Sequence, residues 1–254
     1  MIRYYDINTA GHSVRCKLYC NDVHKIEKVV IFGHGFGGHK DNKAAERFAL
    51  RAISRFKKSA VVTFDLPCHG ADGKKKLLLE DCLTYLDLVC EDSRTRFGVE
   101  DLFAYATSFG GFLVLKYLAD RGNPFRKIAL RCPAVNMYSV ITHSIITPED
   151  MEKLDKGKDV LVGFDRKVKI NKDFLLDLQA EDLRHHDYMD FADDILILHG
   201  TKDEIIPMDD VAAFADDNVI EFVPVENEDH RFSNPAGMDL AIAAILDFFA
   251  PAMA

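Results

Sequence analysis

The sequence predicts an α/β fold in which a mostly parallel sheet is covered by helices on both faces. Short apolar runs without polar alternation recur along the chain, which is typical of strands buried on both faces. Segments with apolar residues at helical spacing separate these runs, and strands that alternate with helices favour parallel pairing. The chain has 254 residues, 48% of them hydrophobic, so it can bury a substantial core.

The expected elements follow in chain order. Residues 1–20 alternate loosely around Asn8-Thr9-Ala10-Gly11, which predicts an antiparallel hairpin at a sheet edge. Buried strands are expected over the apolar runs 28–33, 59–65, 100–107, 127–132, 194–200 and 219–225. Helices are expected over the segments 42–56, 77–96, 109–121, 208–216 and 235–249.

The regular alternation breaks after Pro133, and the chain is more charged and irregular up to about residue 190. A threonine, a proline and two acids at residues 147–150 predict the start of a helix. Apolar runs on either side of Asp165-Arg166 predict a small hairpin, and residues 174–183 a short helix. We therefore expect a core of residues 1–133 and 191–254, with an inserted cap or lid over residues 134–190.

Composition argues against several classes of partner. The formal net charge of −9 argues against binding to nucleic acid or to an anionic membrane. No apolar run approaches the length of a bilayer span, and the N-terminus lacks the apolar region of a signal peptide. The six cysteines form no CxxC pair, and no cluster of histidines and carboxylates has convincing metal spacing. We expect a cytoplasmic protein with free thiols and no metal.

A serine lies at a predicted turn between the strand 100–107 and the helix 109–121. Ser108 is flanked two residues away by Ala106 and Gly110, the small-x-Ser-x-small pattern of a nucleophile elbow. Small flanking residues are needed because a larger side chain would collide across so sharp a turn. Taken alone, this stretch is equally compatible with a turn where glycines only serve packing.

A glycine-rich loop follows the strand 28–33 directly. In His34-Gly35-Phe36-Gly37-Gly38, the glycines let the backbone approach a substrate and point N–H groups into a pocket. The spacing fits neither of the common phosphate-binding loops. The backbone N–H groups of Phe36 and Phe109 are the two candidates for binding an oxyanion. The His34 side chain is expected to be hydrogen-bonded within the loop.

Two further candidates follow later strands. A serine hydroxyl needs a histidine to take its proton, and the histidine needs a carboxylate to orient it. Asp203 comes shortly after the strand 194–200, and His230 comes after the last strand. Singly, Asp203 could cap a helix and His230 could be solvated. The order Ser108, Asp203, His230, with each residue at a strand end, makes a catalytic triad the preferred interpretation.

These motifs resemble those of the α/β-hydrolase superfamily over nearly the whole chain. A further match is Asp65-Leu66-Pro67-Cys68-His69-Gly70, which is similar to the D-x-P-G-H-G turn of that superfamily, with Cys68 in place of the usual glycine. Within it, the chain looks most like bacterial carboxylesterases of the cinnamoyl (feruloyl) esterase type and their serine-aminopeptidase-like relatives. The resemblance implies an eight-stranded, mostly parallel sheet with a lid over the carboxyl ends of its strands.

The expected activity is that of a serine carboxylic-ester hydrolase acting on small or aromatic, cinnamoyl-like acyl esters without a cofactor. A serine aminopeptidase or an acyl thioesterase would use the same triad, and a non-catalytic binding protein of this fold is the remaining alternative. A homodimer is left open. The residues expected to contact a substrate are His34, Gly35, Met137, Tyr138 and Ile141.

Overall fold

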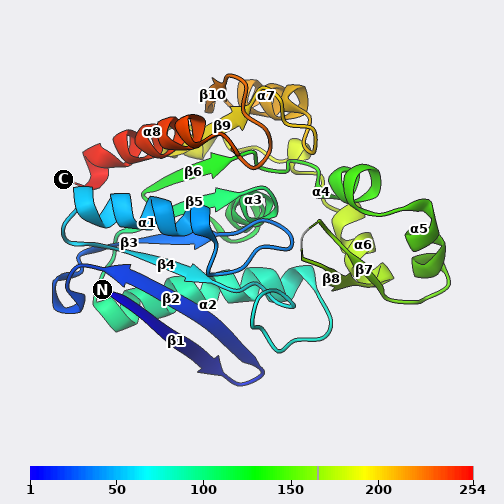
Figure 1. The fold of residues 1–254 in the computed structure, drawn as a ribbon, viewed down its shortest axis with the longest axis horizontal. Helices are drawn as coiled ribbons and strands as arrows, with labels where there is room; N and C mark the ends of the chain where they lie inside the picture. The colour runs from blue at the N-terminus through cyan, green and yellow to red at the C-terminus, as the bar shows by residue number, and fades with distance from the viewer. Residues whose placement is uncertain (165, 254) are drawn as a thin grey trace.

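One eight-stranded sheet forms the centre of the computed structural model, which describes residues 1–164 and 166–253 (Figure 1). The strand order is β1-β2-β4-β3-β5-β6-β9-β10. The strands are β1 (Ile2–Thr9), β2 (His12–Cys20), β3 (Lys28–Gly33), β4 (Ser59–Phe64), β5 (Leu102–Thr107), β6 (Lys127–Arg131), β9 (Ile195–Gly200) and β10 (Glu221–Val225). The β1–β2 hairpin is antiparallel and β2 runs antiparallel to β4, whereas the remaining neighbours are parallel. The predicted edge hairpin and mostly parallel sheet are confirmed.

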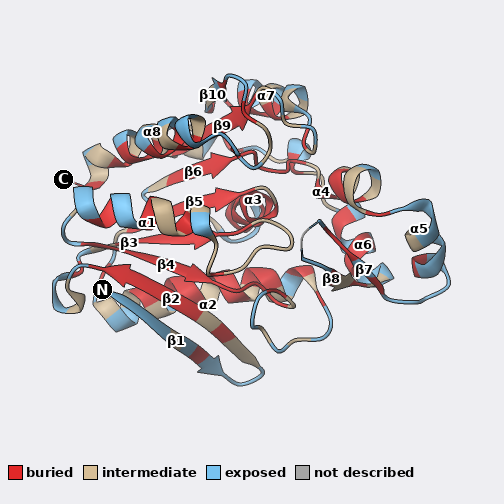
Figure 2. Ribbon diagram, viewed as in Figure 1, coloured by how far each residue is buried: buried red, intermediate tan, exposed pale blue. Residues whose placement is uncertain are grey.

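Helices cover both faces of this sheet. They are α1 (Lys43–Arg55), α2 (Leu79–Phe97), α3 (Phe109–Arg121), α7 (Met208–Asp217) and α8 (Pro235–Met253). Residues of β3 alternate between two cores, because successive side chains of a strand point to opposite faces. Val29 and Ile31 pack in a first core cluster with α2, α3 and α7, and Val30 and Phe32 in a second with α1 and α8. Figure 2 shows the resulting buried strands at the centre of the fold.

Helix α8 is the one place where the expectation about apolar runs fails. Its 19 residues are long and apolar enough, by length and composition, to cross a membrane. The same properties occur in core helices, and here the buried side chains recur every three or four residues on one face: Met238, Ala241, Ile242, Ile245, Leu246 and Phe249. They belong to the second core cluster. In this structure α8 is a core helix.

The segment between β6 and β9 forms a separate small layer. It contains α4 (Met137–Val140), a π-helical turn (Ile141–Ile145), α5 (Pro148–Asp155), β7 (Val160–Val162), β8 (Val168–Ile170) and α6 (Lys172–Gln179). Thr147 and Asp150 form a reciprocal capping box at the start of α5, where the sequence predicts a helix start. Strands β7 and β8 pair antiparallel. Of the predicted turn between them, Asp165 lies outside the described residues. Figure 1 shows this segment beyond the arrowheads of β3 to β6.

Candidate active site

Ser108 occupies the turn between β5 and α3 in a strained conformation. Its φ of 53° and ψ of −118° lie in a region that residues other than glycine seldom adopt. Although Ser108 directly precedes α3, its side chain makes no capping hydrogen bond, so the hydroxyl does not serve the helix. A Cβ at Gly110 would collide with the Gly33 carbonyl of β3. The close packing of α3 on β3 therefore requires glycine at position 110.

The glycine-rich loop after β3 lies against this serine. A Cβ at Gly35 would come within 3.2 Å of Ser108 Cβ. Within the described chain, the backbone N–H groups of Phe36 and Phe109 donate to no protein acceptor. Phe109 begins α3, where the N–H groups have no partner in the helix and the helix dipole favours negative charge. The two predicted oxyanion donors thus both lack a protein acceptor in the described chain; Phe36 lines the cavity described below, whereas Phe109 is completely buried and is not among the lining residues.

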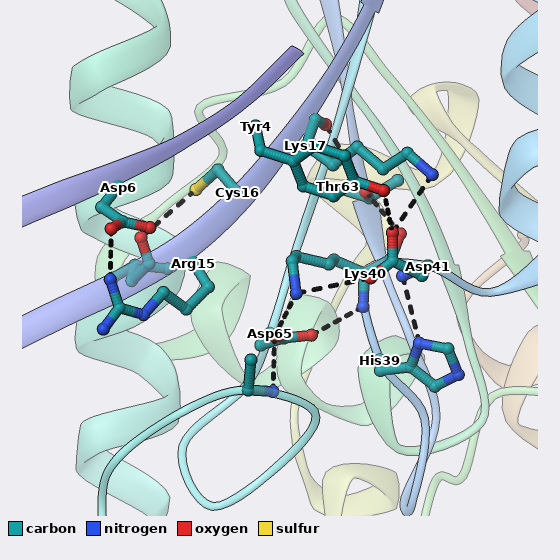
Figure 3. Close-up of polar contacts among 12 residues, drawn as sticks. Tyr4, Asp6, Arg15, Cys16, Lys17, His39, Lys40, Asp41, Thr63 and Asp65 are labelled. Carbon is teal, nitrogen blue, oxygen red and sulfur yellow. Dashed lines mark hydrogen bonds and ion pairs between the residues drawn. The ribbon is translucent and has the colours of Figure 1, made fainter. Parts of the chain in front are cut away.

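A buried ion pair anchors the same loop to β4 (Figure 3). Asp65 Oδ1 accepts from the Lys40 backbone N–H at 2.7 Å, and Asp65 Oδ2 accepts from Lys40 Nζ at 2.9 Å. Thr63 Oγ1 donates to the Lys40 carbonyl at 2.8 Å. The Asp65 carboxylate also accepts from the Ala71 N–H at 2.9 Å. The last residues of β4 therefore set the position of the loop that carries Phe36.

The turn after Asp65 contains two residues in the left-handed conformation, Cys68 and Gly70. Cys68 has a φ of 63°, so it takes the left-handed conformation that glycine would adopt without strain. Gly70 also has a positive φ, and a Cβ there would collide with the Asp65 carboxylate. At position 70 only glycine fits, because the Asp65 carboxylate leaves no space for a Cβ. At position 68 a side chain fits, and glycine would be favoured only because it adopts a positive φ without strain.

His34 is a buried structural residue and does not line the cavity described below. Its Nε2 accepts from the Leu66 N–H at 3.2 Å, and its Nδ1 lies 2.8 Å from the Gly35 carbonyl. Burial, together with the adjacent His69, lowers the pKa of His34 to about 3. The ring is consequently neutral near pH 7 and cannot act as a base there. The expected hydrogen bonding of His34 within the loop is present. The predicted contact of His34 with a substrate is not supported, because His34 does not line the cavity.

Asp203 and His230 lie in direct contact after β9 and β10. His230 Nδ1 is 2.8 Å from Asp203 Oδ2, and the backbone N–H groups of Ile205 and Ile206 donate to Asp203 Oδ1 at 2.9 Å. Burial by itself would raise the pKa of Asp203, but hydrogen bonds from His199 and His230 outweigh it and hold this pKa below its usual range. An ionised Asp203 keeps the proton of neutral His230 on Nδ1, which leaves Nε2 as the basic atom.

His199 is a second histidine on the same carboxylate, which the sequence does not reveal. It is completely buried at the end of β9, and its Nε2 lies 3.2 Å from Asp203 Oδ2 and 3.1 Å from the Ile206 carbonyl. The available signal is its position four residues before Asp203, at the end of an apolar strand. His199 completes the hydrogen bonding of Asp203 from the side opposite to solvent.

Cys132 adds a third possible metal ligand beside Asp203 and His230. One ligand atom from each of these residues lies within 4.8 Å of the other two. Burial raises the pKa of the Cys132 thiol well above its usual value, so it is protonated rather than a thiolate. A thiol must lose its proton to bind a metal, and Asp203 already accepts four hydrogen bonds. The donor set therefore fits a triad better than a metal site.

A cavity of about 330 Å³ contains Ser108 and His230 in its wall. No hydrogen bond of 3.5 Å or less joins Ser108 Oγ to the His230 ring in the described chain. Of the predicted substrate contacts, Gly35 and Met137 line this cavity, whereas His34, Tyr138 and Ile141 do not.

Packing explains the difference at the last two positions. Tyr138 is partly buried and packs against the first core cluster. Ile141 is completely buried in the first core cluster. The described cavity residues that the sequence analysis missed are His39, Asn42, Ala44, Thr107, Arg131, Val140, Ile145, Phe164, Arg166, Ile205 and Arg231.

Comparison with known proteins places this site in a family. The sequence profile of the prolyl oligopeptidase family matches residues 69–254, which include Ser108, Asp203 and His230. No curated protein matches the chain.

Similar solved structures share the fold over almost the whole chain. Est1E from Butyrivibrio proteoclasticus, solved with ferulic acid bound, is 20% identical with a TM-score of 0.78, covering 97% of this chain and 98% of that chain. A soluble variant of monoglyceride lipase from Saccharomyces cerevisiae is 14% identical with a TM-score of 0.75, covering 96% and 93%. Mouse alpha/beta hydrolase domain-containing protein 10 is 17% identical with a TM-score of 0.72, covering 98% and 99%. The chain belongs to the prolyl oligopeptidase family and is a serine hydrolase of the α/β-hydrolase fold.

Proposed function

We propose that this protein hydrolyses carboxylic esters through an acyl-enzyme intermediate on Ser108. The observation that carries the proposal is the contact of 2.8 Å between Asp203 and His230, at the cavity that also contains the strained Ser108. A buried carboxylate that orients a histidine beside a serine is the arrangement needed to make a hydroxyl nucleophilic.

In the proposed reaction, His230 Nε2 takes the Ser108 proton while Ser108 Oγ bonds to the ester carbonyl carbon. The carbonyl oxygen becomes an oxyanion and accepts from the N–H groups of Phe36 and Phe109. His230 then gives its proton to the leaving alcohol oxygen as the C–O bond breaks. Water attacks the acyl-enzyme by the same steps, with His230 again as base. Substrate binding brings Ser108 Oγ and His230 into hydrogen-bond distance, since such contacts tighten in the complex.

The cavity wall supports a small or aromatic acyl group. Apolar side chains from the loop after β3 and from the inserted segment face it: Phe36, Met137, Val140, Ile145 and Phe164. A volume of about 330 Å³ is at the lower end of the range for small-molecule sites. The ferulic acid bound to Est1E, a protein of the same fold, is consistent with an aromatic acyl group.

The Ser108→Ala variant tests this proposal. It should abolish turnover of 4-nitrophenyl acetate and labelling by a fluorophosphonate, because both reactions need the Ser108 oxygen. Ser54→Ala removes an exposed serine of α1 and is the matched control, expected to keep wild-type activity and labelling. Fluorophosphonate labelling that persists in well-folded Ser108→Ala would show that another residue is the nucleophile.

Peptide cleavage is the second candidate, because the family is named for a peptidase. An aminopeptidase would need an anionic group to bind the substrate's free amine, yet the described cavity residues include no aspartate or glutamate. Rates on an aryl ester, an acyl thioester and an aminoacyl amide, measured side by side, separate the three activities.

Cytoplasmic location and the lack of a nucleic-acid or membrane partner stay predictions.

A further inference from the structure

The charge of the active-site cavity is opposite to that of the chain. Aspartate and glutamate outnumber lysine and arginine by 41 to 32 over the whole sequence. Among the described residues that line the cavity, every ionisable side chain belongs to a basic residue: His39, Arg131, Arg166, His230 and Arg231. A cavity lined in this way concentrates negative ligands, because low-dielectric walls focus the field of the arginines.

Arg131 is the arginine of this set whose backbone lies directly beside the reacting serine. It ends β6 and pairs in register with Thr107, the residue before Ser108. The Ser108 N–H donates to the Arg131 carbonyl at 3.1 Å. The carboxyl ends of parallel strands are where open α/β sheets bind ligands, so this arginine is placed for contact with substrate.

The Arg131 guanidinium is buried without a carboxylate partner. The residue is 7% exposed, and no carboxylate of the described chain lies within 4.0 Å of it. Nη1 makes only long contacts, 3.4 Å to the Arg231 carbonyl and 3.5 Å to Met238 Sδ, and buried Nε has no hydrogen-bond partner. An unpaired buried charge is costly, so a guanidinium in this state is suited to an anionic ligand that supplies the missing acceptors.

Arg131 and the apolar cavity residues of α4 belong to opposite faces of the sheet. Arg131 contacts Phe232 and Met238 of the second core cluster, with its Cζ 5.0 Å from the Phe232 ring centre. Met137 and Val140 belong to the first core cluster. Ser108 lies at the strand ends between these two sides. A substrate spanning the cavity therefore meets Arg131 on one side of the reacting bond and the apolar surface of α4 on the other, while Arg231 lies over the Phe164 ring at 5.7 Å.

We propose that Arg131 selects esters that are apolar on one side of the scissile bond and carry a carboxylate or phosphate on the other. This inference rests on the proposed ester hydrolysis. Arg131 binds the anionic group of the substrate through paired N–H donors. This contact positions the ester carbonyl carbon next to Ser108. Arg166 and Arg231, both exposed, line the same cavity and add positive potential to it.

The test uses two pairs of esters, each with one anionic and one neutral member. In the first pair, mono-(4-nitrophenyl) glutarate carries the negative charge on its acyl side and 4-nitrophenyl valerate is the neutral member. In the second pair, 4-acetoxybenzoate carries the charge on its alcohol side and phenyl acetate is the neutral member. We expect the wild type to prefer the anionic member of one pair by about 10- to 100-fold in kcat/KM, the effect of a charge-assisted hydrogen bond. Inhibition by benzoate compared with inorganic phosphate then shows which anion the site prefers.

Arg131→Met should remove that preference, because kcat/KM should fall at least tenfold more for the anionic member than for the neutral member of the same pair. Arg131→Lys keeps the positive charge but loses the planar pair of N–H donors, so it should retain part of the preference for the anionic ester. It replaces Arg131→Met in the test if the methionine variant fails to fold. Arg126→Met, which removes an arginine that pairs with Asp101 outside the cavity, should match the wild type.

The outcomes separate this inference from the proposed function. Equal rates on both members of both pairs, or a preference that survives in Arg131→Met, would overturn the role of Arg131. If kcat/KM of Arg131→Met fell equally on all four esters, Arg131 would be a structural support of the His230 loop. That result would also overturn its proposed role in selecting anionic esters. Failure of the ester proposal itself is distinct, since it would appear as no Ser108-dependent turnover of either neutral ester.

Discussion

The two walls of the cavity are built in different ways. One wall comes from strand ends, where Ser108 and His230 are fixed by close glycine packing and by the buried Asp203. The other comes from the inserted segment, whose longest helices have eight residues and whose strands have three. Phe164 in this second wall is 43% exposed. Figure 2 shows the same contrast between the buried sheet and the exposed outer part of the insertion.

This difference separates chemistry from substrate selection. Groups that react must be held within about 0.5 Å of their productive positions, which requires packing and hydrogen bonds from buried residues. A wall that only selects substrates tolerates change, because its contacts alter binding by small increments. Substitutions in the strand-end wall should therefore have large effects on rate, and those in the insertion wall small effects on preference.

Asp203→Asn tests the strand-end wall and should have the largest effect. The amide cannot stabilise the imidazolium and favours the wrong His230 tautomer, so kcat should fall by about 10⁴-fold. Ester turnover under saturating substrate measures this. Glu204→Gln changes the adjacent, exposed carboxylate and should leave kcat at the wild-type value. A fall of tenfold or less in Asp203→Asn would mean that His230 is oriented by another group.

Acid should destabilise the strand-end side of the molecule through its buried histidines. Burial lowers the pKa of His69 to about 4, although its hydrogen bond to the Pro67 carbonyl acts in the opposite direction. Below the ordinary histidine pKa of 6.5, the unfolded chain binds a proton that folded His69 does not, so stability falls with pH until about pH 4. One such histidine costs about 2 kcal/mol of unfolding free energy between pH 7 and pH 5.

Denaturant unfolding at the two pH values measures this cost. His69→Asn, whose amide can still donate to the Pro67 carbonyl, should show a smaller loss of stability on acidification than the wild type. His185→Gln removes an exposed histidine of the insertion and should behave as the wild type does. Identical pH dependence in all three proteins would contradict the assignment of the effect to His69.

Phe164→Ala tests the insertion wall and should have the smallest effect. Removing this exposed ring from the cavity should shift the preference between acetyl and bulkier aromatic acyl esters by less than about tenfold. The midpoint of thermal unfolding should change little, since exposed positions contribute about 0.5 kcal/mol or less. A loss of activity as large as that of Asp203→Asn would erase the distinction between the two walls.

Local sequence determined the elements and most of the chemistry. The buried strands, the edge hairpin, the helix start at Thr147 and the turn around Ser108 all depend on patterns within a few residues, and each is present in the structure. Ser108, Asp203 and His230 were recognisable because each follows a strand in the order typical of the fold. Physical constraints on a turn or a buried strand act over short distances, so they can be read from neighbouring residues.

Tertiary structure alone decided the surroundings of these residues. Nothing near His199 in sequence shows that its ring contacts Asp203, and nothing near Arg131 shows that its guanidinium lacks a carboxylate partner in the described chain. Packing against the first core cluster likewise keeps Tyr138 and Ile141 out of the cavity. Burial, pairing and shared cavities depend on residues that are distant in the chain and meet only when the sheet and helices pack. For that reason the candidate nucleophile could be predicted from sequence, whereas the charge of the cavity around it emerged only from the folded molecule.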